Sequence, residues 1–337
     1  MKKNYIKIIK TIFFIGLGLF FIFFFWGKLD KEQQQEIIDN FLKANYFWIF
    51  LAFVAGVFSH ILRSARWNLL IETVDSSPPL ITTFNSVMAG YLANLAVPRL
   101  GEITRAAMLS KKTKTSFDKI FGTVLAERAF DLLFYILLFF ITIFFYWGTI
   151  GDYVSKRFLI ADKGTSFFSS WTFIIIVSIV ILTIIFIWVL RKFKHKKTVI
   201  NIRNFFANIL KGILSIFRIK KVFLFFVYTI AMWIMYLLMV YLAFFSIPLS
   251  LDNCLEVAFL VLVFGTIGII IIQGGIGIYP IIVSEIMLIF GVDVATGYSI
   301  GWIAWLVQTI LIIIFGMIAF ILVNYKNKDE YSAANSK

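Results

Sequence analysis

The sequence predicts an all-α polytopic membrane protein, and two observations carry that prediction. Of the 337 residues, 61% are hydrophobic and 15% are charged, whereas soluble domains hold about 45–50% apolar and about 25% charged residues. The apolar residues also lie in long uncharged blocks, and the mean hydropathy is +0.93. Because a helix needs about 20 apolar residues to cross the hydrocarbon core, we expect about six to eight transmembrane helices.

The uncharged blocks define the expected elements in chain order. A first helix is expected within the first block, because lysines precede the block but no small-residue cleavage site of a signal peptide follows it. The blocks cover 11–27, 44–59, 80–98, 132–151, 164–190, 222–251, 257–284 and 294–325.

Basic loops predict the orientation of these helices. Residues 191–221 hold ten basic and no acidic residues, and residues 99–119 hold six basic and two acidic ones. Loops rich in Lys and Arg stay cytoplasmic. We therefore expect a cell inner-membrane protein with both termini cytoplasmic. The net charge of +14 then reflects topology, and no nucleic-acid partner is expected.

Block 80–98 has basic sequence on both sides, so it should enter the membrane and return without crossing it. Residues 255–290 should form an interrupted pair that enters from the other side. The alternative is that both are helical turns at the membrane surface. From the sequence, either segment could be re-entrant or a full span.

Both segments are interrupted by residues that end helices. The first is broken at Pro98 and Gly101, and the second at Gly274, Gly275 and Gly277. Proline and glycine both terminate helices. Interrupted apolar segments at corresponding positions of two halves indicate an inverted repeat with a transporter-like substrate site between the halves.

Three charged residues lie inside the apolar helix expected at 119–147. Glu127 and Asp131 are four residues apart and share one helix face, with Arg128 between them. A charge in the hydrocarbon costs about 2.5–3.5 kcal/mol, so such a residue should face a cavity or a partner. The alternative is that the helix begins in the cytoplasm and these charges lie in the interface.

The cations of the first break are the expected partners of these acids. Arg99 and Arg105 flank Glu102, and Arg63 and Arg66 close block 44–62 on the same side. Guanidinium groups bind phosphate oxygens in a two-pronged fork, so we predict Arg99 to be the phosphate contact of a lipid headgroup. The candidate substrate-binding residues are Arg99, Gly101, Glu102, Arg105, Glu127, Arg128, Asp131, Gly274, Gly275 and Gly277.

Few residues suit other chemistry. One cysteine, Cys254, and two histidines cannot build a cysteine- or histidine-rich metal site, and His60 is interpreted as an interface residue at a helix end. No phosphate-binding Gly-x-x-x-x-Gly-Lys-Ser/Thr loop is present. We therefore expect no cofactor, no metal and no enzymatic activity.

The chain is expected to form a single integral-membrane domain over 1–325. Polar residues keep one helical stripe within 198–217, which predicts an amphipathic helix on the cytoplasmic leaflet. The polar tail 326–337 is expected to be disordered.

The motif Asn94-Leu-Ala-Val-Pro-Arg-Leu-Gly-Glu-Ile-Thr-Arg105, followed by Ala126-Glu-Arg-Ala-Phe-Asp131, resembles the flippase-like transmembrane domain of the lysylphosphatidylglycerol synthase family, which includes UPF0104 proteins. The likeness covers about 10–325. The break at Gly274 is similar to the family's Pro-Gly-Gly-x-Gly motif, although Gln273 stands where proline is usual. After the last helix only about a dozen polar residues follow, so the family's soluble acyltransferase domain is not expected here.

The resemblance implies a lipid flippase or transporter that moves an anionic phospholipid or a polyprenyl-phosphate-linked lipid between leaflets. Its partners would be membrane lipids. Further partners would be other copies of the same chain in a homo-oligomer, or an envelope-synthesis protein. The alternative function is a non-transporting membrane subunit of a lipid-modifying or envelope-assembly enzyme.

Overall fold

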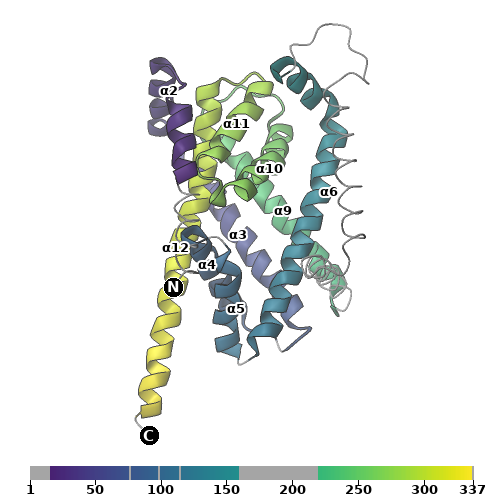
Figure 1. The fold of residues 1–337 in the computed structure, drawn as a ribbon, viewed down its shortest axis with the longest axis vertical. Coiled ribbons are helices and arrows are strands. Elements are labelled where there is room, and N and C mark those ends of the chain that lie inside the picture. The colour runs from purple at the N-terminus through teal and green to yellow at the C-terminus, as the bar shows by residue number, and fades with distance from the viewer. Residues whose placement is uncertain (1–15, 76, 98, 114, 159–218, 336–337) are drawn as a thin grey trace, which may run out of the picture.

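The computed structural model describes residues 16–75, 77–97, 99–113, 115–158 and 219–335, and every regular element in these ranges is a helix (Figure 1). Helical residues Gly16–Trp26 come first. The elements that follow are α2 (Lys31–Leu42), α3 (Tyr46–Ile71), α4 (Leu80–Ala96), α5 (Leu100–Thr113), α6 (Phe117–Phe158), α9 (Val222–Phe244), α10 (Cys254–Ile271), the 3-10 turn η2 (Gln273–Gly275), α11 (Ile278–Ile289) and α12 (Val294–Asn335).

Five helices in the described ranges are long and apolar enough to cross a membrane, namely α3, α6, α9, α10 and α12. This confirms the predicted all-α polytopic membrane fold. Block 164–190 and the amphipathic segment predicted at 198–217 both belong to residues 159–218, which lie outside the described ranges.

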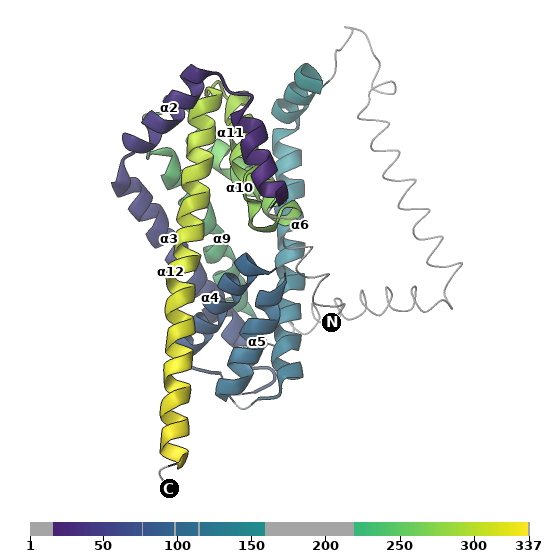
Figure 2. The same cartoon turned by 60° about the vertical axis from the view of Figure 1, so that its left-hand side comes forward.

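Two helical hairpins enter the molecule from opposite ends (Figures 1 and 2). The α4–α5 hairpin begins and ends where α3 ends and α6 begins. We call this the basic end, because Lys111, Lys112, Lys119, Lys220 and Lys221 lie there. The α10–α11 hairpin begins and ends at the opposite end. Each hairpin therefore returns to the end from which it enters, as the basic flanks of the first one predicted.

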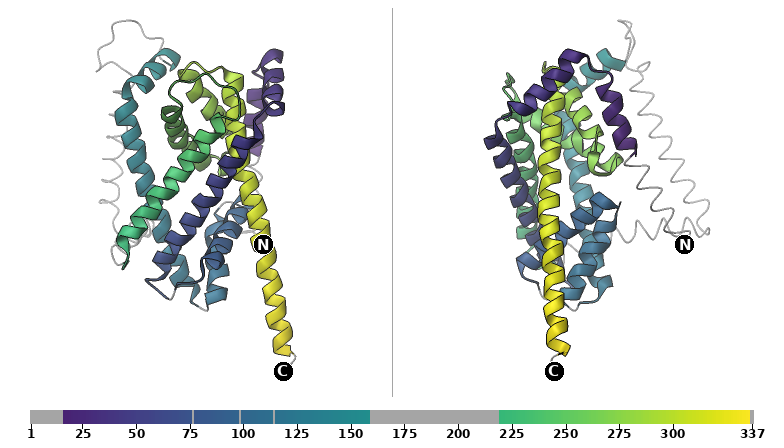
Figure 3. Two further views of the ribbon diagram at one scale, coloured as in Figure 1. Left: turned by 180° about the vertical axis from the view of Figure 1, so that it is seen from behind. Right: turned by 90° about the vertical axis from the view of Figure 1, so that its left-hand side faces the viewer.

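The two halves of the chain form an inverted repeat. The order α3, α4–α5, α6 recurs as α9, α10–α11, α12, and each element of the second set begins 174 to 178 residues after its counterpart. Corresponding elements run in opposite directions between the two ends (Figure 3). Helices α3 and α9 pack along each other at the centre, where Gly56 gives Met239 and Leu311 room to approach.

The α4–α5 hairpin is tight because small residues face each other. A Cβ atom on Gly101 would overlap the carbonyl oxygen of Gly90 and the side chain of Asn94. Glycine at 101 is therefore required for this approach, and it brings the first turn of α5 against α4.

Helix α12 continues to Asn335, and the disorder expected for residues 326–337 stays a prediction. Residues 326–335 contain neither proline nor glycine. Extending an existing helix adds one hydrogen bond for each residue that is fixed. The apolar part of α12 therefore supplies the helical turns from which the polar residues continue the helix.

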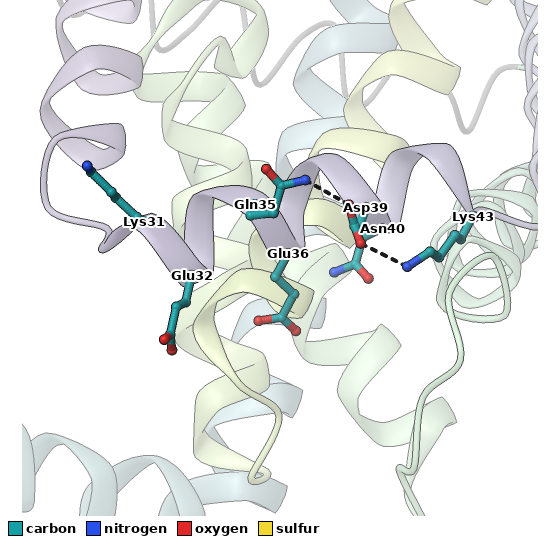
Figure 4. Close-up of a pocket in the computed structure, with 7 residues that line it drawn as sticks. All are labelled: Lys31, Glu32, Gln35, Glu36, Asp39, Asn40 and Lys43. Carbon is teal, nitrogen blue, oxygen red and sulfur yellow. Dashed lines mark hydrogen bonds and ion pairs between the residues drawn. The ribbon is translucent and has the colours of Figure 1, made fainter.

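Helix α2 lies across the opposite end and docks on the start of α12 (Figure 2). Asn40 donates to Ser299 at 3.4 Å, and Thr296 donates to Glu36 at 3.3 Å. A shallow hollow runs beside α2, and its row of Gln35, Asp39 and Lys43 is bonded along the helix (Figure 4). These polar side chains of α2 thus bond either to one another or to α12. This arrangement favours a helix that docks on α12 over a ligand site.

Candidate functional site

A buried ion-pair network joins three helices near the basic end. Nη1 of Arg63, on α3, donates a hydrogen bond to Glu127 at 2.8 Å and another to Asp131 at 2.9 Å, both on α6. Arg66, one turn further along α3, donates Nη2 to Asp131 at 2.5 Å and to Glu127 at 3.3 Å. The acids predicted on one face of α6 are thus bound by two arginines on one face of α3.

Arg105 of α5 completes this network from a third direction. Its Nη2 lies 2.9 Å from the second carboxylate oxygen of Glu127, and its guanidinium carbon lies 4.7 Å from the ring centroid of Trp67. Trp67 is fixed by a 2.9 Å hydrogen bond from its indole nitrogen to Thr123. Among the described residues, Nε and Nη1 of Arg105 have no hydrogen-bond acceptor although they are buried. We call Arg63, Arg66, Arg105, Glu127 and Asp131 the charge cluster.

Helix α9 contributes neutral oxygens to the charge cluster. The hydroxyl of Tyr236 accepts a bond from Nε of Arg63 at 3.3 Å, and Thr229 accepts one from Arg66 at 3.3 Å. Phe225 lies against the guanidinium of Arg66 at 5.4 Å. The polar contacts of the cluster therefore join α3, α5, α6 and α9.

The charge cluster carries one surplus positive charge, since three guanidinium groups meet two carboxylates. The side chains of Arg66 and Glu127 have no exposed surface. Removing each ion from water costs several kcal/mol, which only close pairing and further hydrogen bonds can offset. The unfilled N–H donors of Arg105 and the surplus charge together favour an anionic ligand.

The cluster reaches the surface beside Arg128 and Glu102. Nε of Arg128 lies 3.4 Å from Glu102, and their side chains are 35% and 22% exposed. Between this pair and the cluster lies Tyr91 of α4, whose ring centroid is 6.0 Å from Arg128 and 5.9 Å from Arg63. Arg128 is thus the most accessible cation next to the buried network.

Arg99 does not belong to the charge cluster, so its predicted pairing with the acids of α6 is wrong. It is exposed, it has a left-handed backbone with φ 62°, and it makes no ion pair with any described residue. Arg105 lies six residues further along, which is about 9 Å of helix. The carboxylates are instead bound by arginines of α3, which lies beside α6.

The two breaks meet near the middle of the molecule (Figure 2). A Cβ atom on Gly274 would lie 3.9 Å from Leu95 of α4. Gly274 also accepts a 2.6 Å bond from the indole of Trp305, which fixes the turn η2. Gly277 precedes α11 with φ 75°, a conformation that favours glycine, and as a glycine it has no side chain to cap that end. Helix α5 is capped, because Asn94 accepts from the Gly101 N–H at 2.7 Å.

The structure brings together five of the predicted site residues through ion pairs. Glu102, Arg105, Glu127, Arg128 and Asp131 share one site. Gly101 lies at the start of α5, and Gly274, Gly275 and Gly277 lie at the second break.

Two residue pairs contribute more to the site than the sequence predicted. Arg63 and Arg66 are the main partners of the acids; their three-residue spacing at the end of an apolar block is a signal that could have identified them. Tyr236 and Tyr91 carried no such signal. His60 is not at a helix end as predicted, but lies midway along α3 and is 1% exposed.

Residues 10–316 match the family model described as the lysylphosphatidylglycerol synthase TM region. A UPF0104 membrane protein of Methanocaldococcus jannaschii is 27% identical over 183 residues, which is 53% of this chain and 51% of that protein. A second UPF0104 membrane protein of that organism is 26% identical over 69% of this chain and 94% of its own length. The phosphatidylglycerol lysyltransferase of Staphylococcus epidermidis is 30% identical over 28% of this chain and 11% of its own length. No solved structure matches.

Proposed function

This chain belongs to the family of the lysylphosphatidylglycerol synthase transmembrane region, and from that membership and the charge cluster we propose that it is an inner-membrane lipid flippase or transporter. It moves an anionic phospholipid, or a polyprenyl-phosphate-linked lipid, between the leaflets. A relative named for phosphatidylglycerol supports an anionic phospholipid substrate. The observation that carries the proposal is the surplus of buried guanidinium donors at Arg105.

The physical task is to move a charged headgroup through about 30 Å of hydrocarbon. A headgroup phosphate needs hydrogen-bond donors and positive charge along its route, because an unpaired charge in a low-dielectric medium is strongly disfavoured. Arg128 gives a first contact at the exposed edge, and Arg105 offers two free donors behind it.

The breaks continue this route toward the other leaflet. Helix α11 starts at this second break, after Gly277, and the start of a helix favours anions. In a transporter built from an inverted repeat, the substrate site lies between the repeats near the bilayer midplane. Helix α4 and the turn η2, which carry the two breaks, are neighbours in the structure.

In this proposal the basic end faces the cytoplasm, following the positive-inside rule. We further propose that the protein needs no cofactor and catalyses no covalent step. The ion pairs of Glu127 and Asp131 with arginines support this proposal, because a paired carboxylate is less available as an acid or base. Transport then runs downhill or is coupled to an ion.

The test is lipid translocation in vesicles of phosphatidylethanolamine and phosphatidylglycerol. Tail-labelled fluorescent phosphatidylglycerol is bleached with dithionite, which reaches only the outer leaflet. Vesicles with the protein should lose nearly all fluorescence, and protein-free vesicles about half. Labelled phosphatidylcholine, which lacks net charge, should move at least tenfold more slowly.

The matched variant is Arg128→Gln, which removes the accessible cation and leaves the charge cluster intact. It should lower phosphatidylglycerol translocation at least tenfold while the protein still purifies as a folded species. Wild-type vesicles that lose only half of their fluorescence for both lipids would contradict transport of an anionic phospholipid. The same result with a labelled polyprenyl-phosphate lipid would favour the non-transporting subunit.

A further inference from the structure

His60 is one of the most buried polar residues in the described structure, and no described residue bonds its ring nitrogens. It is 1% exposed, and among the described residues neither ring nitrogen has a hydrogen-bond partner. Its ring lies against Tyr91, with 5.0 Å between the centroids. A buried polar group without a partner costs about 1–3 kcal/mol. A phenylalanine would fill the same space without that cost.

The location of His60 connects it to the proposed route. It lies three residues before Arg63 on α3, about 4.5 Å of helix rise toward the middle of the molecule. Tyr91, which it contacts, also faces Arg63 and Arg128. His60 therefore follows directly on the charge cluster, on the side away from the basic end.

Tyr91 also connects His60 to the region of the two breaks. Tyr91 is in the last two turns of α4, and one turn further Leu95 is the nearest side chain to the position that a Cβ atom on Gly274 would take. In the inverted repeat the residue 176 positions after His60 is Tyr236, whose hydroxyl accepts a bond from Arg63. Tyr236 thus bonds Arg63 from α9, and His60 lies one turn before Arg63 on α3, against Tyr91 of α4.

We propose that His60 is a second, uncharged headgroup-binding residue, which hydrogen-bonds the phosphate or hydroxyl oxygens of the lipid after they leave the charge cluster. This inference rests on the proposed function. A neutral imidazole supplies one donor and one acceptor, which suits a phosphate oxygen and a headgroup hydroxyl. The neutral form fits here because the neighbouring cluster already has a surplus positive charge.

The decisive comparison is between His60→Phe and His60→Gln in the dithionite assay with labelled phosphatidylglycerol. Phenylalanine keeps the ring and its contact with Tyr91 but removes both nitrogens, whereas glutamine loses the ring and keeps a donor and an acceptor. We expect His60→Phe to lower the rate at least tenfold and His60→Gln to retain at least a third of it. The lipid fraction giving half the maximal rate should stay unchanged, because the charge cluster is intact.

A purely structural role of His60 predicts the reverse order, with phenylalanine the milder change, and that result would overturn the inference. Failure of the wild-type protein to translocate lipid would instead reject the proposed function.

A measurement on the unmodified side chain removes the dependence on variant folding. The sequence contains two histidines, His60 and His195, so ¹⁵N-histidine labelling gives few signals, and His195→Gln assigns them. In phosphatidylcholine nanodiscs, added phosphatidylglycerol should shift the ring nitrogens of His60. Unchanged nitrogens at lipid levels that saturate transport would also overturn the proposal.

Discussion

Replacing Glu127 by glutamine tests how far the charge cluster holds the fold together. Its two carboxylate oxygens contact Arg63 at 2.8 Å, Arg66 at 3.3 Å and Arg105 at 2.9 Å, and the side chain has no exposed surface. Glutamine keeps one acceptor oxygen but turns an NH₂ group toward a guanidinium. The surplus charge of the cluster rises from one to two.

The expected loss follows from this geometry. Removing one partner of a buried ion pair destabilises a protein by about 3–5 kcal/mol, because the remaining charge is left uncompensated. With a shift of about 2 °C for each kcal/mol in a large domain, the unfolding midpoint should fall by roughly 6–10 °C. Glu127→Gln should therefore impair folding as well as transport.

The assay is the fraction of monodisperse protein in detergent after heating, measured for wild type, Glu127→Gln and a matched control. The control is Glu102→Gln, the same chemical change at a partly exposed acid 3.4 Å from Arg128. A pair of that kind contributes about 1 kcal/mol or less, so the control should shift by no more than about 2 °C.

A double variant, Glu127→Gln with Arg105→Gln, restores a surplus of one charge. It should be less destabilised than the sum of its single variants by about 0.5–3 kcal/mol, as expected for residues in contact. Equal midpoints for Glu127→Gln and Glu102→Gln, or strict additivity in the double variant, would refute the reasoning.

Two further predictions concern the hairpin and the opposite end. Gly101→Ala should destabilise by about 1–3 kcal/mol, because its Cβ overlaps Gly90, whereas Gly122→Ala, where nothing lies within 4 Å, should stabilise by about 1 kcal/mol. Equal heating midpoints for the two would contradict the packing argument. Burial and the nearby carboxylate of Asp293 raise the pKa of Glu36. Glu36 therefore stabilises the folded protein when it is protonated. This stabilisation is lost as the pH rises through the pKa of Glu36 in the folded state. Hydrogen-exchange protection of α2, corrected for intrinsic rates, should thus grow as pH falls, and Glu36→Gln should abolish this trend. If the variant keeps the trend, a group other than Glu36 causes it.

The sequence alone determined the features that depend on local composition. Uncharged blocks set the spans, the basic flanks of block 80–98 set the direction of its hairpin, and the glycines at 274 and 277 marked the second break. Acids within an apolar helix must find partners wherever the chain folds, so Glu127 and Asp131 could be identified as site residues without a structure.

Only the tertiary structure decided which cations meet those acids. Arg99 and Arg105 are nearer in sequence to Glu127 than Arg63 is, yet Arg99 is exposed and Arg63 bonds both carboxylates. The choice depends on how α3 packs beside α6, which is set by contacts summed over many apolar residues far apart in the chain. The burial of His60 has the same origin: its neighbours within α3 give no sign of Tyr91, which the α4–α5 hairpin brings against it.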